Sequence, residues 1–320
     1  MANRMIRGPL VSRRHRQVVK GAIVATIFSV CVSACGKDDA DRVADSQLQA
    51  QLTQDRSRVM VVAHRACWRL APENSIEAIE ECIRIGVDMV EIDVQKTRDG
   101  HLVIIHDDTV DRTTDGSGEV SNYTLAEVAM LRLKEGEGGK AVAITDARIP
   151  TLEQALATAK DRILVNLDVK ADVRDEAYRI ARSMGVDDQI LIKMSMTSSA
   201  DVALGETEFF GNTHFMPIVR EENGSLEQQV RDLRVTDPVA YEVIYVNESA
   251  LETACELAAA FKSRCWVNTM WERLSPGHSD DVAVADPEKH WGHLIGLGVN
   301  MIQTDRPQAL IAYLNNERSP

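Results

Sequence analysis

The sequence lacks any concentration of positive charge. Its 320 residues carry 36 basic and 49 acidic side chains, which gives a formal net charge of −13 at pH 7. No basic patch or stripe is present, and this argues against a nucleic-acid-binding protein. An acidic enzyme that acts on an anionic ester must therefore gather its cations, or a metal ion, in one place.

Long hydrophobic runs are also missing, with one exception near the start. The run "GAIVATIFSVCV", residues 21–32, is shorter than the roughly 20 residues that a membrane helix needs. Arg13, Arg14, Arg16 and Lys20 precede it, a pattern typical of a secretory signal. The following "VSAC" resembles a bacterial lipobox, which predicts lipidation of Cys35. The alternative is an ordinary signal peptide in which the cysteine occurs by chance. Arg13 and Arg14 also leave open export by the twin-arginine route.

These features predict three segments. Residues 1–34 form a lipoprotein signal peptide, whose removal takes away six basic residues and no acid and moves the net charge to −19. Residues 35–56 form a polar tether, and residues 57–320 form the folded domain. We expect a bacterial cell-envelope protein held to the membrane by its lipid. Gly36 after Cys35 favours the outer membrane if the source has two membranes.

Cysteines are few, and their spacing fits no zinc motif. Of the six, Cys31 leaves with the signal and Cys35 is the predicted lipidation site. The remaining four face an export compartment where disulfides persist. Cys255 and Cys265 flank a predicted helix-to-strand connection and could pair, but the sequence alone does not decide this.

The folded part alternates between apolar β-rich runs and helical patterns, which predicts a parallel sheet. The runs are 59–64, 87–94, 163–169, 189–194, 213–219, 241–247, 264–268 and 299–305. The helical patterns include 75–86, 151–160, 173–184, 225–234, 249–262 and 307–315. Eight strand units in about 265 residues indicate a closed (β/α)8 TIM barrel.

A ninth run, "HLVIIH" at 101–106, follows the second strand without a helix between them, so we expect a β-hairpin. With Asp99-Gly100 as a two-residue loop, His106 would lie opposite Asp93. Residues 107–150 are too long for an ordinary barrel loop. We interpret them as an active-site insertion that covers substrate, with a disordered surface loop as the alternative.

Polar residues gather where the predicted strands end, the edge at which TIM barrels carry their sites. Three acids, Glu91, Asp93 and Asp168, would supply the hard oxygen ligands of one divalent cation, Mg²⁺ or Ca²⁺. The alternative for Glu91 and Asp93 is a metal-free cluster of ion pairs. His64 and His106 would act as general acid and base. The candidate phosphate- and substrate-binding residues are Arg65, Lys170, Lys193, Trp266 and Asn268.

The motifs also carry a family resemblance. The segments "AHRACWRLAPENSIEAI" and "GVDMVEIDVQKTRDGHLVIIHDDTVDRTTDGSG" resemble the glycerophosphodiester phosphodiesterase family, with its His-Arg, Pro-Glu-Asn, Glu-x-Asp and His-Asp elements. The likeness returns at 148–156, 166–170, 265–269 and 298–310, so it covers nearly the whole chain from about residue 59.

The resemblance implies that His64 and His106 are the catalytic pair, that Glu91, Asp93 and Asp168 hold the metal, and that Glu73 supports them. Three positions depart from the family pattern. Asp168 stands where many members have glutamate, and an aspartate at this position resembles the related sphingomyelinase D and lysophospholipase D branch. Ala66 replaces the glycine that usually follows His-Arg in the family. If that glycine needs a positive φ, the loop after the first strand should differ here, because alanine disfavours such a φ. Ser75 replaces threonine, and either residue can cap the following helix.

We therefore expect metal-dependent hydrolysis of glycerophosphodiesters to an alcohol and glycerol 3-phosphate. One alternative is a lysophospholipase D or sphingomyelinase D-like enzyme acting on lipids, and another is an inactive lipid-anchored binding protein. Asp305 is interpreted only as a helix cap. Six further histidines lack motif context and are interpreted as structural or solvated: His15, His101, His214, His278, His290 and His293.

Overall fold

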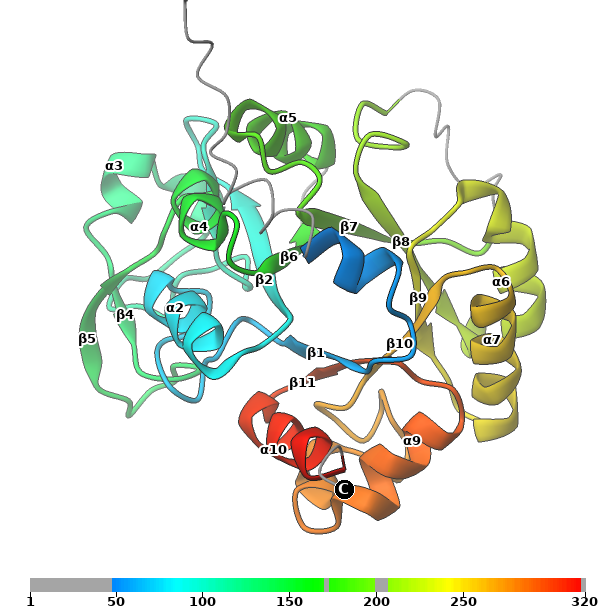
Figure 1. Cartoon of the computed structure of the whole chain (residues 1–320). Helices are drawn as coiled ribbons and strands as arrows, with labels where there is room; N and C mark the ends of the chain where they lie inside the picture. Colours follow the sequence, from blue (N-terminus) through cyan, green and yellow to red (C-terminus); the bar gives the residue numbers. More distant parts are fainter. Residues whose placement is uncertain (1–47, 170–172, 199–206, 318–320) are drawn as a thin grey trace, which may run out of the picture. The chain divides into compact units, whose positions relative to one another are not determined.

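A closed barrel of eight parallel strands is the centre of the fold, as predicted (Figure 1). The computed structural model describes residues 48–169, 173–198 and 207–317. The barrel runs in the order β1-β11-β10-β9-β8-β7-β6-β2, and β2 pairs with β1 to close it. Its strands are β1 (Met60–Ala63), β2 (Met89–Lys96), β6 (Leu164–Val169), β7 (Ile190–Ser195), β8 (His214–Arg220), β9 (Ala240–Ile244), β10 (Arg264–Asn268) and β11 (Met301–Thr304).

Helices cover the outside of the barrel and bury their apolar faces against the strands. The predicted helices are present as α2 (Ile76–Ile85), α4 (Leu152–Ala159), α5 (Arg174–Met184), α6 (Leu226–Leu233), α7 (Glu248–Ala260) and α10 (Pro307–Glu317). Ser75 caps α2 as expected, because its hydroxyl accepts a hydrogen bond from Ala78 N at 3.0 Å. The sequence did not predict three short elements before β11: α8 (Asp280–Ala283), the π-helix η6 (Glu288–Gly292) and α9 (His293–Gly296).

The interior of the barrel changes from apolar to polar along six of its eight strands. Alternation within strands sends one layer of side chains inward near the strand starts, and this layer is fully buried. Its members are Met60, Val62, Met89, Leu164, Leu191, Met216, Ala240, Trp266 and Met301. The next inward layer toward the carboxyl ends is polar and also buried, and it contains Glu91, Asn166, Lys193, Glu242, Asn268 and Gln303. Such a polar layer is costly unless its groups are paired, so it marks where function lies.

Part of the predicted tether instead belongs to the barrel. A short helix at 48–53 lies across the end where the strands begin (Figure 1, blue), and its Leu52 packs against the apolar layer with no exposed surface. The buried Arg264 guanidinium donates to the carbonyls of Gln51, Leu52 and Asp55. The tether prediction was therefore wrong for residues 48–56. The segment is mostly polar, so nothing in its composition predicted that Leu52 fills the end of the barrel where the strands begin.

The predicted β-hairpin is present, but its register differs by one residue. Strand β3 (Leu102–Ile104) pairs antiparallel with β2, with Val94 opposite Ile104. The loop holds three residues rather than two, because Thr97 N donates to the carbonyl of His101 at 2.9 Å. Gly100 takes a φ of 90°, the left-handed conformation that a three-residue loop requires. Ile105, not His106, therefore lies opposite Asp93, and the 2.9 Å bond from Ile105 N to Asp93 O confirms this.

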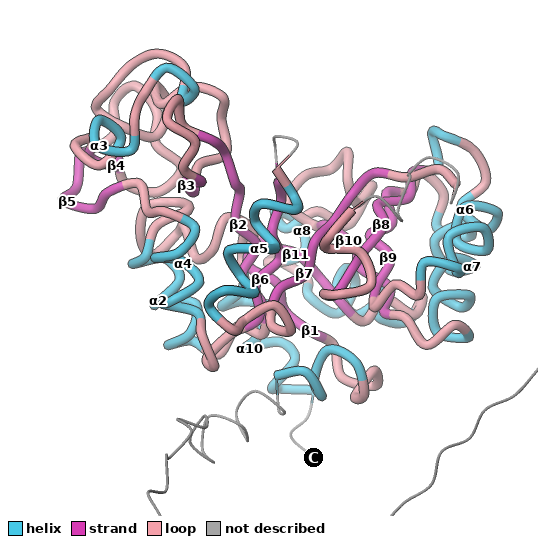
Figure 2. Tube along the Cα trace, turned by 90° about the horizontal axis from the view of Figure 1, so that it is seen from above, coloured by secondary structure: helices cyan, strands magenta, loops and turns pink. Residues whose placement is uncertain are grey.

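Residues 107–150 are ordered, so the disordered-loop alternative is wrong. They contain η1 (Val120–Asn122), α3 (Leu125–Val128) and the antiparallel pair β4 (Arg132–Lys134) and β5 (Ile144–Arg148). With β3 they form a lobe to one side of the barrel (Figure 2), which has an apolar core of its own around Val110, Val128 and Leu133. That the segment covers bound substrate stays a prediction.

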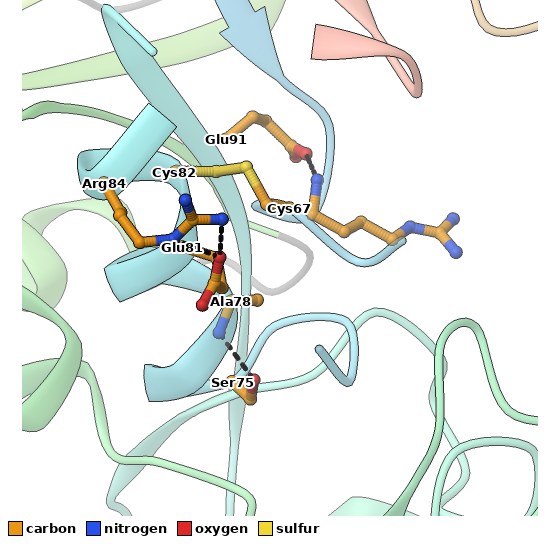
Figure 3. The surroundings of a disulfide bond; sticks show 8 residues. Cys67, Ser75, Ala78, Glu81, Cys82, Arg84 and Glu91 are labelled. Carbon is orange, nitrogen blue, oxygen red and sulfur yellow. Dashed lines mark hydrogen bonds and ion pairs between the residues drawn. A yellow bond between two sulfur atoms is a disulfide. The ribbon is translucent and has the colours of Figure 1, made fainter. Parts of the chain in front are cut away.

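Among the described residues, two disulfides join elements of the barrel, one a helix to a strand and the other a loop to a helix. Cys255 in α7 pairs with Cys265 in β10, with the Cα atoms 5.1 Å apart, which settles the pairing that the sequence left open. A second bridge, which we did not predict, joins Cys67 in the loop after β1 to Cys82 in α2, with a Cα separation of 5.4 Å (Figure 3). The latter holds the loop that carries His64 and Arg65 against the helix that follows it.

The signal peptide, Cys35 and the first part of the tether lie outside the described residues, so lipidation and envelope location stay predictions. Among the residues that the structure describes, no helix has the length and apolar character needed to cross a membrane.

Candidate active site

A pocket of about 430 Å³ opens at the carboxyl ends of the barrel strands. Residues of all eight barrel strands or their ends line it, together with His106 and the segment after β10. The predicted residues that line it are His64, Arg65, Glu91, Asp93, His106, Asp168, Lys193 and Asn268. The structure thus brings together side chains that span more than 200 positions of sequence, because parallel strands deliver their ends to one edge.

Two predicted substrate-binding residues are not in this set. Lys170 lies outside the described residues. Trp266 is not a pocket residue, because it points into the buried apolar layer with no exposed surface. Its indole Nε1 donates to Asn268 Oδ1 at 2.7 Å, and the Asn268 amide donates to Glu242 Oε1 at 2.8 Å. Trp266 therefore orients a pocket residue from below rather than contacting substrate.

Three acids form the floor of the pocket. Glu91 and Asp93 point inward from β2, and Asp168 pairs with Asp93 across the parallel strands β2 and β6. One oxygen from each lies within 4.8 Å of the others. Glu91 and Asp93 are each only 1% exposed. Burial and the neighbouring charge of Asp93 raise the pKa of Glu91 from its usual 4.5 to about 7, so the ionised cluster calls for a cation.

Lys193 on β7 supplies part of that positive charge. Its Nζ lies 3.2 Å from Asp168 Oδ2, 3.7 Å from Glu242 Oε2 and 3.9 Å from Glu91 Oε1. Burial would lower the pKa of Lys193, but the charges of Asp168, Glu242 and Glu91 outweigh it and hold that pKa above its usual value. Lys193 is thus a buried cation, and its charge is shared among three acids rather than held by one.

The oxygen set fits a divalent cation. Carboxylate oxygens are what Mg²⁺ and Ca²⁺ prefer, and three of them converge here. Among the described residues of the same interior, three buried acceptors have no hydrogen-bond donor: Asn166 Oδ1, Glu242 Oε2 and Gln303 Oε1. One lysine against Glu91, Asp93, Asp168 and Glu242 leaves the acids in excess, so a bound cation would relieve the repulsion that raises the pKa of Glu91.

His64, at the end of β1, is oriented by a residue that the sequence analysis set aside. Its Nδ1 lies 2.8 Å from Asp305 Oδ1, at the end of β11. Asp305 also accepts from Trp68 Nε1 at 2.7 Å, and its backbone N–H donates to Asp280. Burial acts to lower the pKa of His64, but the hydrogen bond to Asp305 and the charge of Glu91 raise it above the usual value.

His106 has a matching arrangement. Its Nδ1 lies 2.7 Å from Asp107 Oδ1, and Arg112 binds Asp107 through two bonds of 2.7 and 2.9 Å. Arg112 in turn forms a bidentate pair with the buried Glu73, at 2.8 and 2.7 Å. The hydrogen bond from Arg112 holds the pKa of Asp107 far below its usual range. The insertion thus fixes His106 through Arg112, although it adds no residue from 107–150 to the pocket lining.

Both histidines therefore share one design. A carboxylate takes Nδ1 of each ring, which fixes the tautomer and leaves Nε2 as the atom available to move a proton. Arg65 completes the arrangement: its Nη1 donates to Glu73 at 3.2 Å, and its Nε lies 3.7 Å from Asp93. Glu73 is 2% exposed and joins Arg65 to Arg112, and its supporting role stays a prediction.

The loop after β1 is held in a strained conformation. Arg65 and Ala66 have φ of 50° and 60°, in the left-handed region that disfavours residues other than glycine. Arg65 N donates to Glu91 Oε2 at 2.9 Å, and Ala66 N donates to the carbonyl of Glu91 at 3.0 Å. Ala66 thus takes the positive φ that we considered for the family's glycine, and strand β2 holds it there.

The sequence contained signals for the residues that were missed. Asp305 directly follows the last strand, at the edge of the barrel where the site lies. Asp107 directly follows His106, inside the His-Asp element of the family pattern. Glu242 shows the inward alternation of β9. No local signal marked Arg112, because its role depends on how the insertion folds back onto Glu73.

Replacing Asp305 with asparagine is expected to lower kcat/KM by about 10-fold or more, because the wrong tautomer of His64 becomes accessible. The change also removes the interaction that raises the pKa of His64. The limb of the pH–rate profile that reports His64 should therefore move to lower pH: the acidic limb if His64 is the base, the alkaline limb if it is the acid. The matched control is Trp68→Phe, which removes the hydrogen bond from Trp68 Nε1 to the Asp305 carboxylate. A profile with neither limb moved in Asp305→Asn would rule out this role.

Fold and site together define a TIM-barrel protein with a paired-histidine, acid-rich pocket. Comparison with known proteins points to one family of phosphodiesterases. Residues 64–207 match the model of the glycerophosphoryl diester phosphodiesterase family, and residues 215–314 match a domain of unknown function. The solved structure of a glycerophosphoryl diester phosphodiesterase from Parabacteroides distasonis is 26% identical, covers 86% of this chain and 93% of its own, and has a TM-score of 0.69.

Curated relatives match over a shorter segment. A glycerophosphodiester phosphodiesterase of Caldanaerobacter subterraneus is 42% identical over 117 residues, which are 36% of this chain and 47% of that protein. Human glycerophosphodiester phosphodiesterase 1 is 34% identical over 140 residues, which are 42% of this chain and 39% of the human protein. The matched segment thus spans half or less of these relatives. These matches relate the chain to the glycerophosphodiester phosphodiesterase family.

Proposed function

We propose that this protein hydrolyses glycerophosphodiesters to an alcohol and glycerol 3-phosphate. One observation carries the proposal: two histidines, each with a carboxylate on Nδ1, line the same pocket as a cluster of three acids. Hydrolysis of a phosphodiester requires a base for the nucleophile, an acid for the leaving alkoxide and positive charge for the phosphate oxygens. This pocket offers a residue for each of these tasks.

We propose the following roles. His64 Nε2 takes the proton of the attacking hydroxyl, which is either the substrate's own glycerol hydroxyl or a water molecule. Attack by the glycerol hydroxyl expels the alcohol and forms a cyclic phosphate, which water then opens to glycerol 3-phosphate, whereas attack by water gives glycerol 3-phosphate directly. His106 Nε2 protonates the leaving alkoxide, and the reverse assignment is the alternative. Glu91, Asp93 and Asp168 would hold one divalent cation, Mg²⁺ or Ca²⁺, which supplies positive charge to the phosphate oxygens when bound. Arg65 and Lys193 add fixed positive charge at the floor of the pocket.

The relatives support the substrate class. Curated relatives from bacteria and mammals carry the name glycerophosphodiester phosphodiesterase. A phosphodiesterase from Oleispira antarctica, which has the same fold (TM-score 0.56, 21% identity), was solved with its product sn-glycerol-3-phosphate. We propose that the present pocket binds the same glycerol phosphate moiety.

A second candidate keeps the chemistry and changes the substrate to lysophospholipids or sphingomyelin. Asp168, which replaces the usual glutamate, and the predicted lipid anchor favour it. The pocket argues against it, because its lining is mostly polar: of its residues, only Ile244, Met270, Trp271 and Leu274 would face an acyl chain.

The test compares glycerophosphocholine with lysophosphatidylcholine, which share a headgroup and differ by the acyl chain. We expect kcat/KM to be higher for glycerophosphocholine, because the polar pocket gains nothing from an acyl chain. Sphingomyelin and glycerophosphoethanolamine extend the panel to another lipid and another headgroup. Higher kcat/KM for either lipid would favour the second candidate, and no turnover of any of the four would favour an inactive binding protein.

A further inference from the structure

A second cluster of metal-ligating side chains lies outside the pocket just described. It consists of Glu248, at the first turn of α7, His278, in the connection after β10, and His293, at the start of α9. None of the three lines the active-site pocket. They come from three separate elements, so their convergence is a property of the fold rather than of a local motif.

The ligand atoms of this cluster lie close together, and both histidines direct Nε2 toward the Glu248 carboxylate. His278 Nε2 lies 2.9 Å from Glu248 Oε1, and His293 Nε2 lies 2.9 Å from Glu248 Oε2. One ligand atom from each residue lies within 4.8 Å of the other two. The two imidazole rings stack with their centroids 4.8 Å apart and their planes 21° from parallel. Two imidazole nitrogens and a carboxylate oxygen therefore face one small volume.

His290 provides the outer support that metal-binding histidines usually have. Its Nδ1 lies 3.2 Å from His278 Nδ1. With a metal on His278 Nε2, the proton of His278 sits on Nδ1 and donates to His290. That hydrogen bond fixes the tautomer and the ring direction, as outer-shell partners do in zinc sites. The side chain of His278 is 11% exposed, while those of Glu248 and His293 are 44% and 42% exposed. The site is thus anchored on one side and open to solvent on the other.

We propose that Glu248, His278 and His293 bind a divalent transition metal, with Zn²⁺ the best match to two imidazoles and one carboxylate. Water would complete the coordination from the open side. The donor set differs in kind from the all-oxygen cluster of the pocket, which suits Mg²⁺ or Ca²⁺. The two sites should therefore be separable by metal.

The position of the cluster indicates a structural role. His278 ends the segment that carries Trp271 and Arg273 to the pocket, and Asp280 follows two residues later. Asp280 accepts hydrogen bonds from Thr269 and from Asp305 N, both at about 2.6–2.7 Å. A metal that joins this segment to α7 and α9 would hold it in place, so that binding raises the thermal stability of the whole domain.

The experiment titrates metal-stripped full-length protein with Zn²⁺ by calorimetry and with Co²⁺ by visible absorption. We expect one Zn²⁺ to bind to the wild type and to Glu91→Gln, and a Co²⁺ spectrum with imidazole nitrogen in the coordination sphere. The double variant His278→Ala/His293→Ala should lose this site, and His290→Ala should weaken it by about 10- to 100-fold. Zn²⁺ should raise the melting temperature of the wild type but not of the double variant.

His101→Ala removes an exposed histidine elsewhere and is the matched control for histidine content. His293→Ala alone, at a half-exposed position, covers the case in which the double variant fails to fold. Zn²⁺ affinity that is unchanged in His293→Ala, or lost in Glu91→Gln but kept in the double variant, would overturn the proposal. So would the absence of any Zn²⁺ binding to the wild type. Glycerophosphodiester turnover takes no part in these readouts, so the result is independent of the proposed function.

Discussion

Replacing either His64 or His106 with alanine is expected to lower kcat for glycerophosphocholine by about 100- to 10,000-fold. General acid–base catalysis contributes a factor of this size, and each ring presents Nε2 to the pocket while a carboxylate holds Nδ1. The double variant should be little worse than the single ones, because groups that act in one proton-transfer sequence are not additive.

His101→Ala is the control for this pair, since it removes a histidine from an exposed turn. His64 is buried and bonded to Asp305, so thermal unfolding of His64→Ala separates lost chemistry from lost stability. His106 is one-third exposed, and its replacement should leave stability almost unchanged. A variant of either histidine with wild-type kcat would remove that residue from the mechanism.

The Glu91→Gln variant is expected to lose metal-dependent turnover while the metal-free protein gains stability. Glutamine keeps the shape of the side chain but is a poor ligand for a hard cation. It also removes one of two buried like charges, Glu91 beside Asp93. Asp168→Glu, which restores the family's usual residue, is the matched variant and should remain active.

The gain in stability of metal-free Glu91→Gln should depend on pH. Burial and Asp93 raise the pKa of Glu91 from 4.5 to about 7 in the folded state. The folded protein therefore binds a proton that the unfolded chain has released, and stability falls as pH rises from about 4.5 through about 7. The contribution is on the order of 3 kcal/mol. Chemical unfolding should show this loss in the metal-free wild type but not in Glu91→Gln. If the free energy of unfolding falls with pH equally in both proteins, the raised pKa of Glu91 is contradicted.

Much of the fold follows from the sequence because the signals are local and repeated. Eight near-continuous apolar runs, each bounded by turns and helices, permit few architectures other than a closed parallel barrel. Glu91, Asp93, Asp168 and His64 were predicted as site residues because strand ends in such a barrel must meet. Motif order and spacing then linked them to a family.

What the sequence did not provide were features set by tertiary contacts. The hairpin loop holds three residues because Gly100 has a positive φ while Asp99 does not, whereas a two-residue Asp-Gly turn needs both, and this moved the register by one position. His106 reaches the pocket from the loop after β3 rather than by cross-strand pairing. Cys67 and Cys82 pair through the packing of a loop on α2, which no spacing rule specifies. Asp305 looked like a helix cap until β11 placed it beside His64.

One measurement tests the central claim most directly: phosphorus NMR of the products formed from glycerophosphocholine by chelator-stripped protein before and after Mg²⁺ or Ca²⁺ is restored. The account predicts no turnover without metal, and glycerol 3-phosphate with no phosphocholine once one of these ions is present. Release of phosphocholine, or full turnover in the stripped protein, would contradict it.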